Sequence, residues 1–329
     1  MSEGKILVIG GAGYIGSHVV KALNESLFAV TVYDNFSTGQ ECNLFPDNKL
    51  VKGDILDSAK LEQTMSEGFD AVIHLAAKKA VGESMEKPDF YAKNNLIGSI
   101  NIFNAMLKNG IQNIVFSSSA AVYGTPQYIP VDEQHPTNPI NFYGFTKLEI
   151  EKVMNWYSEL KNFNYIALRY FNAVGYAADG SVCGMEKNPQ NLQPIVMENI
   201  TGKREKIFVF GNDYETPDGT CLRDYIHVED LASAHVLSVK HLMKNHSSHI
   251  FNLGTGKGTS VLEIIQSVER VTGKKVNYEI APRRAGDPAV LTASSKSAET
   301  VLGWKPEYTN IDDIIKTVWN MELKNNGKL

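Results

Sequence analysis

Cysteine is scarce in this chain of 329 residues, which contains only Cys42, Cys183 and Cys221. The three are odd in number and lie far apart, so the sequence excludes a CxxC pair and argues against a disulfide framework. We therefore expect reduced thiols in an intracellular protein of the cytoplasm.

Long apolar runs and runs of basic residues are also missing. No segment approaches the roughly 20 apolar residues that a membrane helix needs, and the apolar N-terminus lacks a charged leading region and a small-residue cleavage site. We therefore expect no membrane association and no export. The net charge of -5 and the lack of a basic run argue against a nucleic acid partner, so any phosphate is expected to bind in a local pocket.

Grouped metal ligands are equally hard to find. His241, His246 and His249 stand close together in KHLMKNHSSHI, but that segment has no cysteine or carboxylate that could complete a metal site. We expect an exposed polar surface there and no bound metal. With 43% hydrophobic and 21% charged residues, the composition is that of a folded globular protein with a large core.

The first half of the chain alternates between strand and helix patterns. Short apolar runs that predict strands occupy residues 5–9, 29–33, 49–53, 71–75, 113–118 and 165–169. Helical patterns occupy residues 14–23, 88–109 and 141–160. This alternation predicts an α/β fold with a Rossmann-type, doubly wound parallel sheet.

The pattern changes near residue 172. Residues 175–194 are rich in Gly, Asn and Pro, and beyond them only scattered elements are predicted, with strands at 207–210 and 250–253 and a helix at 261–272. We therefore predict a smaller, mixed α/β lobe after the Rossmann domain.

A glycine-rich turn follows the first predicted strand. Gly10, Gly13 and Gly16 stand in GGAGYIG, where missing Cβ atoms allow a tight turn and the approach of a pyrophosphate to the helix N-terminus. Asp34 ends the second strand about 20 residues on, where a carboxylate can bind a ribose diol and would repel a 2′-phosphate. The sequence therefore predicts NAD rather than NADP.

Two further strand ends are predicted to border the same crevice. The residues concerned are Asp54 and Ile55 after the third strand, and Leu75, Ala76 and Ala77 after the fourth. Ligands of doubly wound folds bind at the carboxyl ends of the strands, although either segment alone could be a plain loop.

A YxxxK pair on a predicted helix supplies the candidate chemistry. Tyr143 and Lys147 are four residues apart and so lie on one helix face, where an ammonium can favour the phenolate form of the tyrosine. Ser119 ends the preceding strand, in FSSSAAVYG, at the ligand-binding edge of the sheet. The three together predict a catalytic acid–base group, whereas the pair alone would fit any exposed helix.

These motifs resemble the extended short-chain dehydrogenase/reductase family. Within it, the chain resembles the sugar-nucleotide epimerases in particular, through HLAAKKAVGES, RYFNAVG, NLQP, VFGNDYETPDGTCLRDYIHVEDLA, NLGTGKG and PRRAGDPA. The resemblance implies reversible epimerisation at C4 of a UDP-hexose, UDP-glucose or UDP-galactose, through a 4-keto sugar with tightly bound NAD. It also implies a homodimer formed through the helices at 88–109 and 141–160.

The resemblance assigns residues and domains as well. It implies a NAD-binding domain at 1–172, with returning segments around 223–255, and a UDP-sugar-binding domain at 173–329. Further cofactor residues would be Tyr14, Ile15, Asn35, Lys79, Asn94, Ser117, Tyr143, Lys147 and Tyr170. Substrate residues would be Lys79, Ser119, Tyr143, Phe171, Asn172, Asn191, Leu192, Phe208, Val209, Phe210, Arg223, Tyr225, Arg284, Asp287 and Leu291.

Some positions depart from the family pattern or allow other interpretations. Ala121 stands where many members carry Thr, the stretch from Asp34 to Asp54 is short, and Leu291 leaves open whether N-acetylated sugars are accepted. Arg223 could instead pair with Asp224, and Arg284 with Asp287, as surface ion pairs. A dehydratase, decarboxylase or uronate epimerase of the same fold is the alternative function, and a non-catalytic NAD sensor is a second class.

Overall fold

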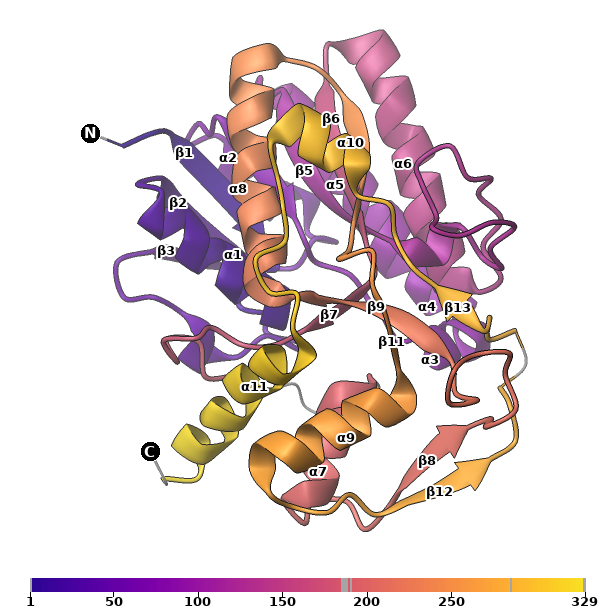
Figure 1. The fold of residues 1–329 in the computed structure, drawn as a ribbon. Helices are drawn as coiled ribbons and strands as arrows, with labels where there is room; N and C mark the ends of the chain where they lie inside the picture. Colours follow the sequence, from indigo (N-terminus) through magenta and orange to yellow (C-terminus); the bar gives the residue numbers. More distant parts are fainter. Residues whose placement is uncertain (1, 185–188, 190, 285, 328–329) are drawn as a thin grey trace.

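A sheet of seven parallel strands forms the centre of the molecule (Figure 1). The computed structural model describes residues 2–184, 189, 191–284 and 286–327. The strand order is β10-β6-β5-β4-β1-β2-β3. Their bounds are β1 (Lys5–Ile9), β2 (Ala29–Asp34), β3 (Lys49–Lys52), β4 (Ala71–His74), β5 (Asn113–Ser119), β6 (Asn164–Tyr170) and β10 (His249–Leu253). The predicted doubly wound α/β fold is confirmed.

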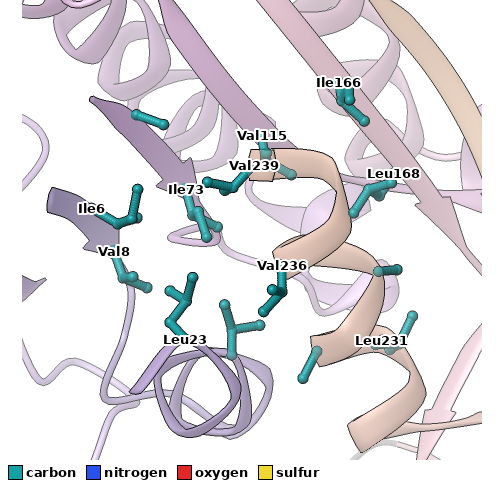
Figure 2. Close-up of a cluster of buried hydrophobic side chains, with 14 of the residues drawn as sticks. Ile6, Val8, Leu23, Ile73, Val115, Ile166, Leu168, Leu231, Val236 and Val239 are labelled. Atoms are coloured by element: carbon teal, nitrogen blue, oxygen red, sulfur yellow. The ribbon is translucent and has the colours of Figure 1, made fainter. Parts of the chain in front are cut away.

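Helices cover both faces of this sheet because its strands are apolar on both sides. On β1, Ile6 and Val8 pack towards α1 (Tyr14–Glu25) and α8 (Val228–Asn245), in the cluster shown in Figure 2. Leu7 and Ile9 alternate with them and belong to the cluster on the opposite face. That face is covered by α2 (Ser58–Met65), α5 (Gly98–Lys108) and α6 (Phe142–Lys161).

The edge strand β10 comes from late in the sequence. After β6 the chain forms β7 (Asn172–Val174) and leaves for the smaller lobe, then returns through β9 (Leu222–His227) and α8 to add β10 beside β6. Strand β9 pairs with β7, β11 (Gly258–Ser260) and β13 (Val290–Leu291) in a second sheet at the junction of the lobes. The division at residue 172 stays a prediction.

The smaller lobe packs around its own core. Strands β8 (Ile207–Phe210) and β12 (Tyr278–Ala281) pair in parallel. Helix α7 (Leu192–Ile200) packs on β8 and on α9 (Val261–Thr272), and α11 (Ile311–Asn325) packs on α9 (Figure 1). Helix α9 begins with a capping box, in which Ser260 and Glu263 satisfy each other's backbone N–H groups. Helix α10 (Lys296–Leu302) instead packs on α8 and β10 of the larger lobe.

Several short elements lie outside the predicted pattern. The predicted helix at 88–109 consists of α4 (Pro88–Tyr91), a π-helical turn (Ala92–Ile97) and α5. The remaining short elements are α3 (Val81–Glu86) and the 3₁₀ turns Glu41–Asn43 and Ala120–Val122. Within the described ranges, no helix is long and apolar enough to cross a membrane.

The histidine cluster is less exposed than predicted. His241 and His249 are half-buried, each bonds the Ser247 hydroxyl at 3.0 Å, and only His246 is exposed. The prediction of an exposed surface was wrong for these two residues, because His249 belongs to β10 and stacks on Phe251, and the His241 ring packs edge-on against the His249 ring. Among the described residues, no group of three His, Cys, Asp or Glu could hold a metal ion.

Candidate active site

The glycine-rich turn lies between β1 and α1 and leaves no room for side chains. Gly10 has a φ of +88°, and a Cβ there would lie 2.7 Å from the Ala76 nitrogen. A Cβ on Gly16 would lie 2.1 Å from the Gly10 carbonyl oxygen. Gly13 is the N-cap of α1, so backbone N–H groups of the helix begin directly at the turn. This is the form that a pyrophosphate site requires.

Asp34 holds the turn from the end of β2. One of its carboxylate oxygens accepts the Ala12 N–H at 2.9 Å, and the other accepts the Phe36 N–H at 2.8 Å. The sequence predicted a ribose ligand for this residue but not its bond to the glycine turn. A carboxylate has about four acceptor positions, so these two bonds leave capacity for a diol.

The next two strand ends border the same turn. Asn35 donates to the Asp54 carboxylate at 2.8 Å, and Ile55 packs against Gly98 of α5. The Leu75 and Ala76 N–H groups both donate to the Ile9 carbonyl, and Ala77 follows them. The structure therefore brings these predicted cofactor residues together at the carboxyl edge of the sheet.

Asn95 lies at this edge and was missed by sequence reasoning. Its amide bonds the Lys78 N–H at 2.9 Å, the Lys78 carbonyl at 3.0 Å and the Thr146 hydroxyl at 3.1 Å. The neighbouring Asn94 donates to Asn95 at 3.0 Å, and Lys79 is exposed next to this loop. Asn95 thus joins the π-helical turn to α6, and π turns often occur at functional sites.

Ser119, Tyr143 and Lys147 meet where β5 ends and α6 begins. Tyr143 lies in the first turn of α6 and is hydrogen-bonded to Ser119. The helix approaches closely because Gly144 faces the Ala121 carbonyl, where a Cβ would lie 2.4 Å from the oxygen. The Ala121 N–H donates to the Ser119 hydroxyl at 3.2 Å.

Lys147 reaches back along the same strand. Its buried ammonium donates to the Ser117 carbonyl at 2.6 Å and lies 5.8 Å from the centre of the Tyr143 ring. The Ser117 hydroxyl is bonded to the Tyr170 hydroxyl of β6. The predicted catalytic residues and their two predicted neighbours therefore form one contact group.

Burial sets the protonation of the central pair. It raises the pKa of Tyr143 to about 12, against the effect of the Ser119 hydrogen bond. It lowers the pKa of Lys147 to about 7, against the effect of the Glu151 carboxylate. In the protein alone Tyr143 is therefore a neutral phenol at pH 7, and a further positive charge nearby is needed to favour the phenolate.

The low pKa of Lys147 makes the stability of the folded protein depend on pH. Lys147 has a folded pKa of about 7 against an ordinary 10.5, so the folded state binds fewer protons and gains stability as pH rises through that window. We expect Lys147→Met to raise the melting temperature of the NAD-free protein most near pH 7, with a gain that shrinks towards pH 10.5. Thermal melts of both proteins across this range test it, and a gain that stays constant with pH would contradict it.

The second sheet brings four predicted substrate residues onto neighbouring strands. Asn172 of β7 is paired with Tyr225 of β9, and Leu291 of β13 is paired with Arg223 of β9. Phe171 directly precedes Asn172 and is buried with Leu291 in one cluster. The tip of β9 therefore faces the region between the lobes.

Arg223 does not form the alternative surface pair with Asp224. It lies 3.4 Å from the Asp287 carboxylate and donates to the Pro288 carbonyl at 2.8 Å. Asp224 is fully buried and accepts backbone N–H groups from Thr255, Gly256 and Ala293, at 2.7, 2.9 and 3.0 Å. Successive residues of a strand point to opposite faces, which separates the two side chains.

The remaining predicted substrate residues lie on the smaller lobe. The Arg284 guanidinium stacks 3.9 Å from the centre of the Phe210 ring, and Phe208 is 47% exposed on the same strand. Val209 points the other way into the core, so only its backbone can contact a ligand. Asn191 caps α7 without a side-chain bond, and Leu192 is its first residue.

Comparison with known proteins gives consistent matches. Residues 6–254 match the model of the NAD dependent epimerase/dehydratase family. A UDP-glucose 4-epimerase of Halalkalibacterium halodurans is 47% identical, over 96% of this chain and 94% of its own length.

Solved structures of similar proteins match nearly the whole chain. One is a UDP-glucose 4-epimerase from Brucella ovis in complex with NAD, with a TM-score of 0.93, 46% identity, and coverage of 95% of this chain and 96% of that one. Another, from Bifidobacterium longum, is in complex with NAD+ and UDP, with a TM-score of 0.92, 39% identity, and coverage of 99% and 100%.

Proposed function

The chain belongs to the NAD dependent epimerase/dehydratase family, and on that premise we propose that it is an enzyme that interconverts UDP-glucose and UDP-galactose by inverting C4 of the sugar. The observation that carries this proposal is the contact group of Ser119, Tyr143 and Lys147 beside the glycine turn. Relatives with this activity match nearly the entire chain.

The residues at the sheet edge fit NAD. Gly10 and Gly16 form a cradle that any Cβ would fill, and Asp34 carries the carboxylate that a ribose diol needs. Gly13 and the first turn of α1 would hold the pyrophosphate, and Lys147 the nicotinamide ribose. When bound, NAD supplies the group that accepts the C4 hydride and returns it.

Side chains of the protein would carry out the proton transfer. Tyr143, as phenolate, takes the proton of the sugar 4-hydroxyl and later returns it, while Ser119 bonds that hydroxyl and keeps it next to Tyr143. Lys147 stabilises the phenolate from one helical turn away. Arg223 and Arg284 would bind the diphosphate, which leaves the hexose free to turn over between the two half-reactions.

Product analysis tests this function directly. The purified protein is incubated with UDP-galactose, first without added NAD and then with it, and the sugar nucleotides are separated by chromatography. Formation of UDP-glucose supports the proposal. If UDP-galactose is not converted even when NAD is added, the proposal is refuted and a dehydratase or decarboxylase is favoured. Parallel incubation with UDP-N-acetylgalactosamine shows whether Leu291 leaves room for the acetyl group.

The same-fold alternatives receive little support. We expect a dehydratase to carry an acidic pair after the serine strand, whereas Ala120 and Ala121 follow Ser119. The full-length relatives reported above are UDP-glucose 4-epimerases.

A homodimer and a cytoplasmic location belong to the same proposal. The helical stretch from α4 to α5 and helix α6 lie side by side and expose large apolar side chains, including Phe90, Ile97, Trp156 and Leu160. Apolar surface of this kind often marks an interface. Ile97 is 52% exposed and Trp156 is 60% exposed, which makes them suitable probes.

We expect Ile97→Glu or Trp156→Glu to convert the dimer into a monomer, because a charge at the centre of an apolar interface loses its hydration. Size-exclusion chromatography with light scattering gives the mass. Leu27→Glu is the control, since Leu27 is 65% exposed at the distant turn before β2. A wild-type protein that elutes as a monomer contradicts this prediction.

A further inference from the structure

Three successive serines at the end of β5 each contact helix α6. The Ser117 carbonyl accepts a hydrogen bond from the Lys147 ammonium, and the Ser118 hydroxyl donates one to the Glu151 carboxylate at 2.5 Å. The Ser119 side chain is hydrogen-bonded to Tyr143. The three helix residues are spaced by four and therefore share one face of α6. The strand and helix are thus joined by polar bonds at three consecutive levels.

Glu151 is the buried end of this row. Only 3% of its side chain is exposed, and it accepts two hydrogen bonds from Arg169 Nε, at 3.0 and 3.2 Å, and one from Arg169 Nη2 at 2.5 Å. The Ser118 hydroxyl completes its set of donors. The carboxylate is therefore fully paired although it lies inside the apolar layer between β5 and α6.

Arg169 extends the network across the sheet. Its Nη1 donates to the Tyr123 hydroxyl at 2.9 Å, and Tyr123 donates to the Asn252 amide oxygen at 2.6 Å. Asn252 lies on β10, while Tyr123 follows the 3₁₀ turn that starts after Ser119. One chain of bonds therefore ties α6, β6, β10 and the segment after Ser119.

We propose that Glu151 is a positioning residue that, with Arg169 and Ser118, fixes the register of α6 on β5 so that Tyr143 and Lys147 face Ser119. The proposal rests on the proposed function for its catalytic consequence. Packing alone gives no reason for the charge, because well-packed apolar residues can replace a buried ion pair without loss of stability. The directional bonds to Ser118, by contrast, specify one position of the helix along the strand.

Glu151→Gln tests this role. An Arg169 N–H faces each of the two carboxylate oxygens, so an amide nitrogen in place of either oxygen would set donor against donor, and the substitution also removes the charge that pairs with the guanidinium. We expect kcat for UDP-galactose to fall about 10- to 100-fold, because small misplacements of reacting groups cost that much. We expect KM to change little, since Arg223 and Arg284, on the other side of the site, are untouched.

Two further variants separate positioning from stability. Ser118→Ala removes one bond of the row and keeps the ion pair, so a smaller loss of kcat is expected even if Glu151→Gln folds poorly. Glu322→Gln is the matched control, because Glu322 is an equally buried carboxylate, bonded to Lys203, in α11 of the smaller lobe. It should lower the melting temperature without lowering kcat.

A crystal structure of the Glu151→Gln variant without substrate shows whether α6 keeps its position on β5. We expect the bond between Lys147 and the Ser117 carbonyl, 2.6 Å in the wild-type protein, to lengthen or break. Unchanged strand–helix bonds together with unchanged kcat would overturn the proposal. A wild-type protein that converts no UDP-galactose would refute the proposed function instead, and the crystal structure would still decide whether Glu151 positions the helix.

Discussion

Tyr143→Phe is expected to lower kcat for UDP-galactose by about 10²- to 10⁴-fold, the usual contribution of a positioned acid–base group. Phenylalanine keeps the ring between Ser119 and Lys147 but has no hydroxyl to take the proton of the sugar. The glycine turn and Asp34 are unaffected, so bound NAD should remain. The two measurements are the initial rate of UDP-glucose formation and the NAD released on denaturation.

Tyr157→Phe is the matched control for this variant. Tyr157 lies on the same helix, where its hydroxyl bonds Asn104 at 3.0 Å on the exposed side. Its loss should leave the rate nearly unchanged. If Tyr143→Phe also retained most of the wild-type rate, Tyr143 could not be the acid–base group, and the proposed mechanism would fail.

Gly16→Ala is expected to abolish NAD binding and to destabilise the fold by about 3 kcal/mol or more, the upper range for an overpacked site. The added methyl carbon would lie 2.1 Å from the Gly10 carbonyl oxygen and 2.9 Å from Gly11 Cα. Both neighbours are backbone atoms, so relief requires the whole turn to move away from α1. Thermal melts and titration with NAD measure the two effects.

A second helical glycine supplies the control. Gly82 lies in α3, and a Cβ there would meet nothing within 4 Å. Gly82→Ala should therefore be neutral or stabilise by about 0.5–1 kcal/mol through reduced chain entropy. If Gly16→Ala and Gly82→Ala had the same melting temperature and the same affinity for NAD, the close approach of Gly16 to Gly10 would not be required for cofactor binding.

The parallel sheet was predictable because each of its first six strands is a short apolar run, and helical patterns lie between several of them. The first strand and the helix at 261–272 have the predicted bounds, and the other sheet strands differ by a residue or so at an end. Helix α8 received no prediction, although its apolar side chains belong to the core on one face of the sheet. Its polar residues, such as Asp230 and His235, are buried and interrupt the apolar pattern of a surface helix.

The site was predictable only where a motif fixes local geometry. The spacing of Tyr143 and Lys147 and the position of Ser119 after a strand are local features, and the structure brings these residues together. The partners of Glu151 and Asp224 come from distant segments, which no spacing in the sequence reveals. The burial that lowers the pKa of Lys147 also depends on tertiary packing.

The late arrival of β10 means that neither lobe corresponds to one continuous piece of the gene. A fragment ending at residue 172 would lack α8 and β10, and so would expose Ile166 and Leu168 and leave β6 as an unpaired edge, which promotes aggregation. The fragment beginning there would carry α8 with no sheet to cover. The two halves should therefore fold together in one chain, because each of them supplies elements of the larger lobe.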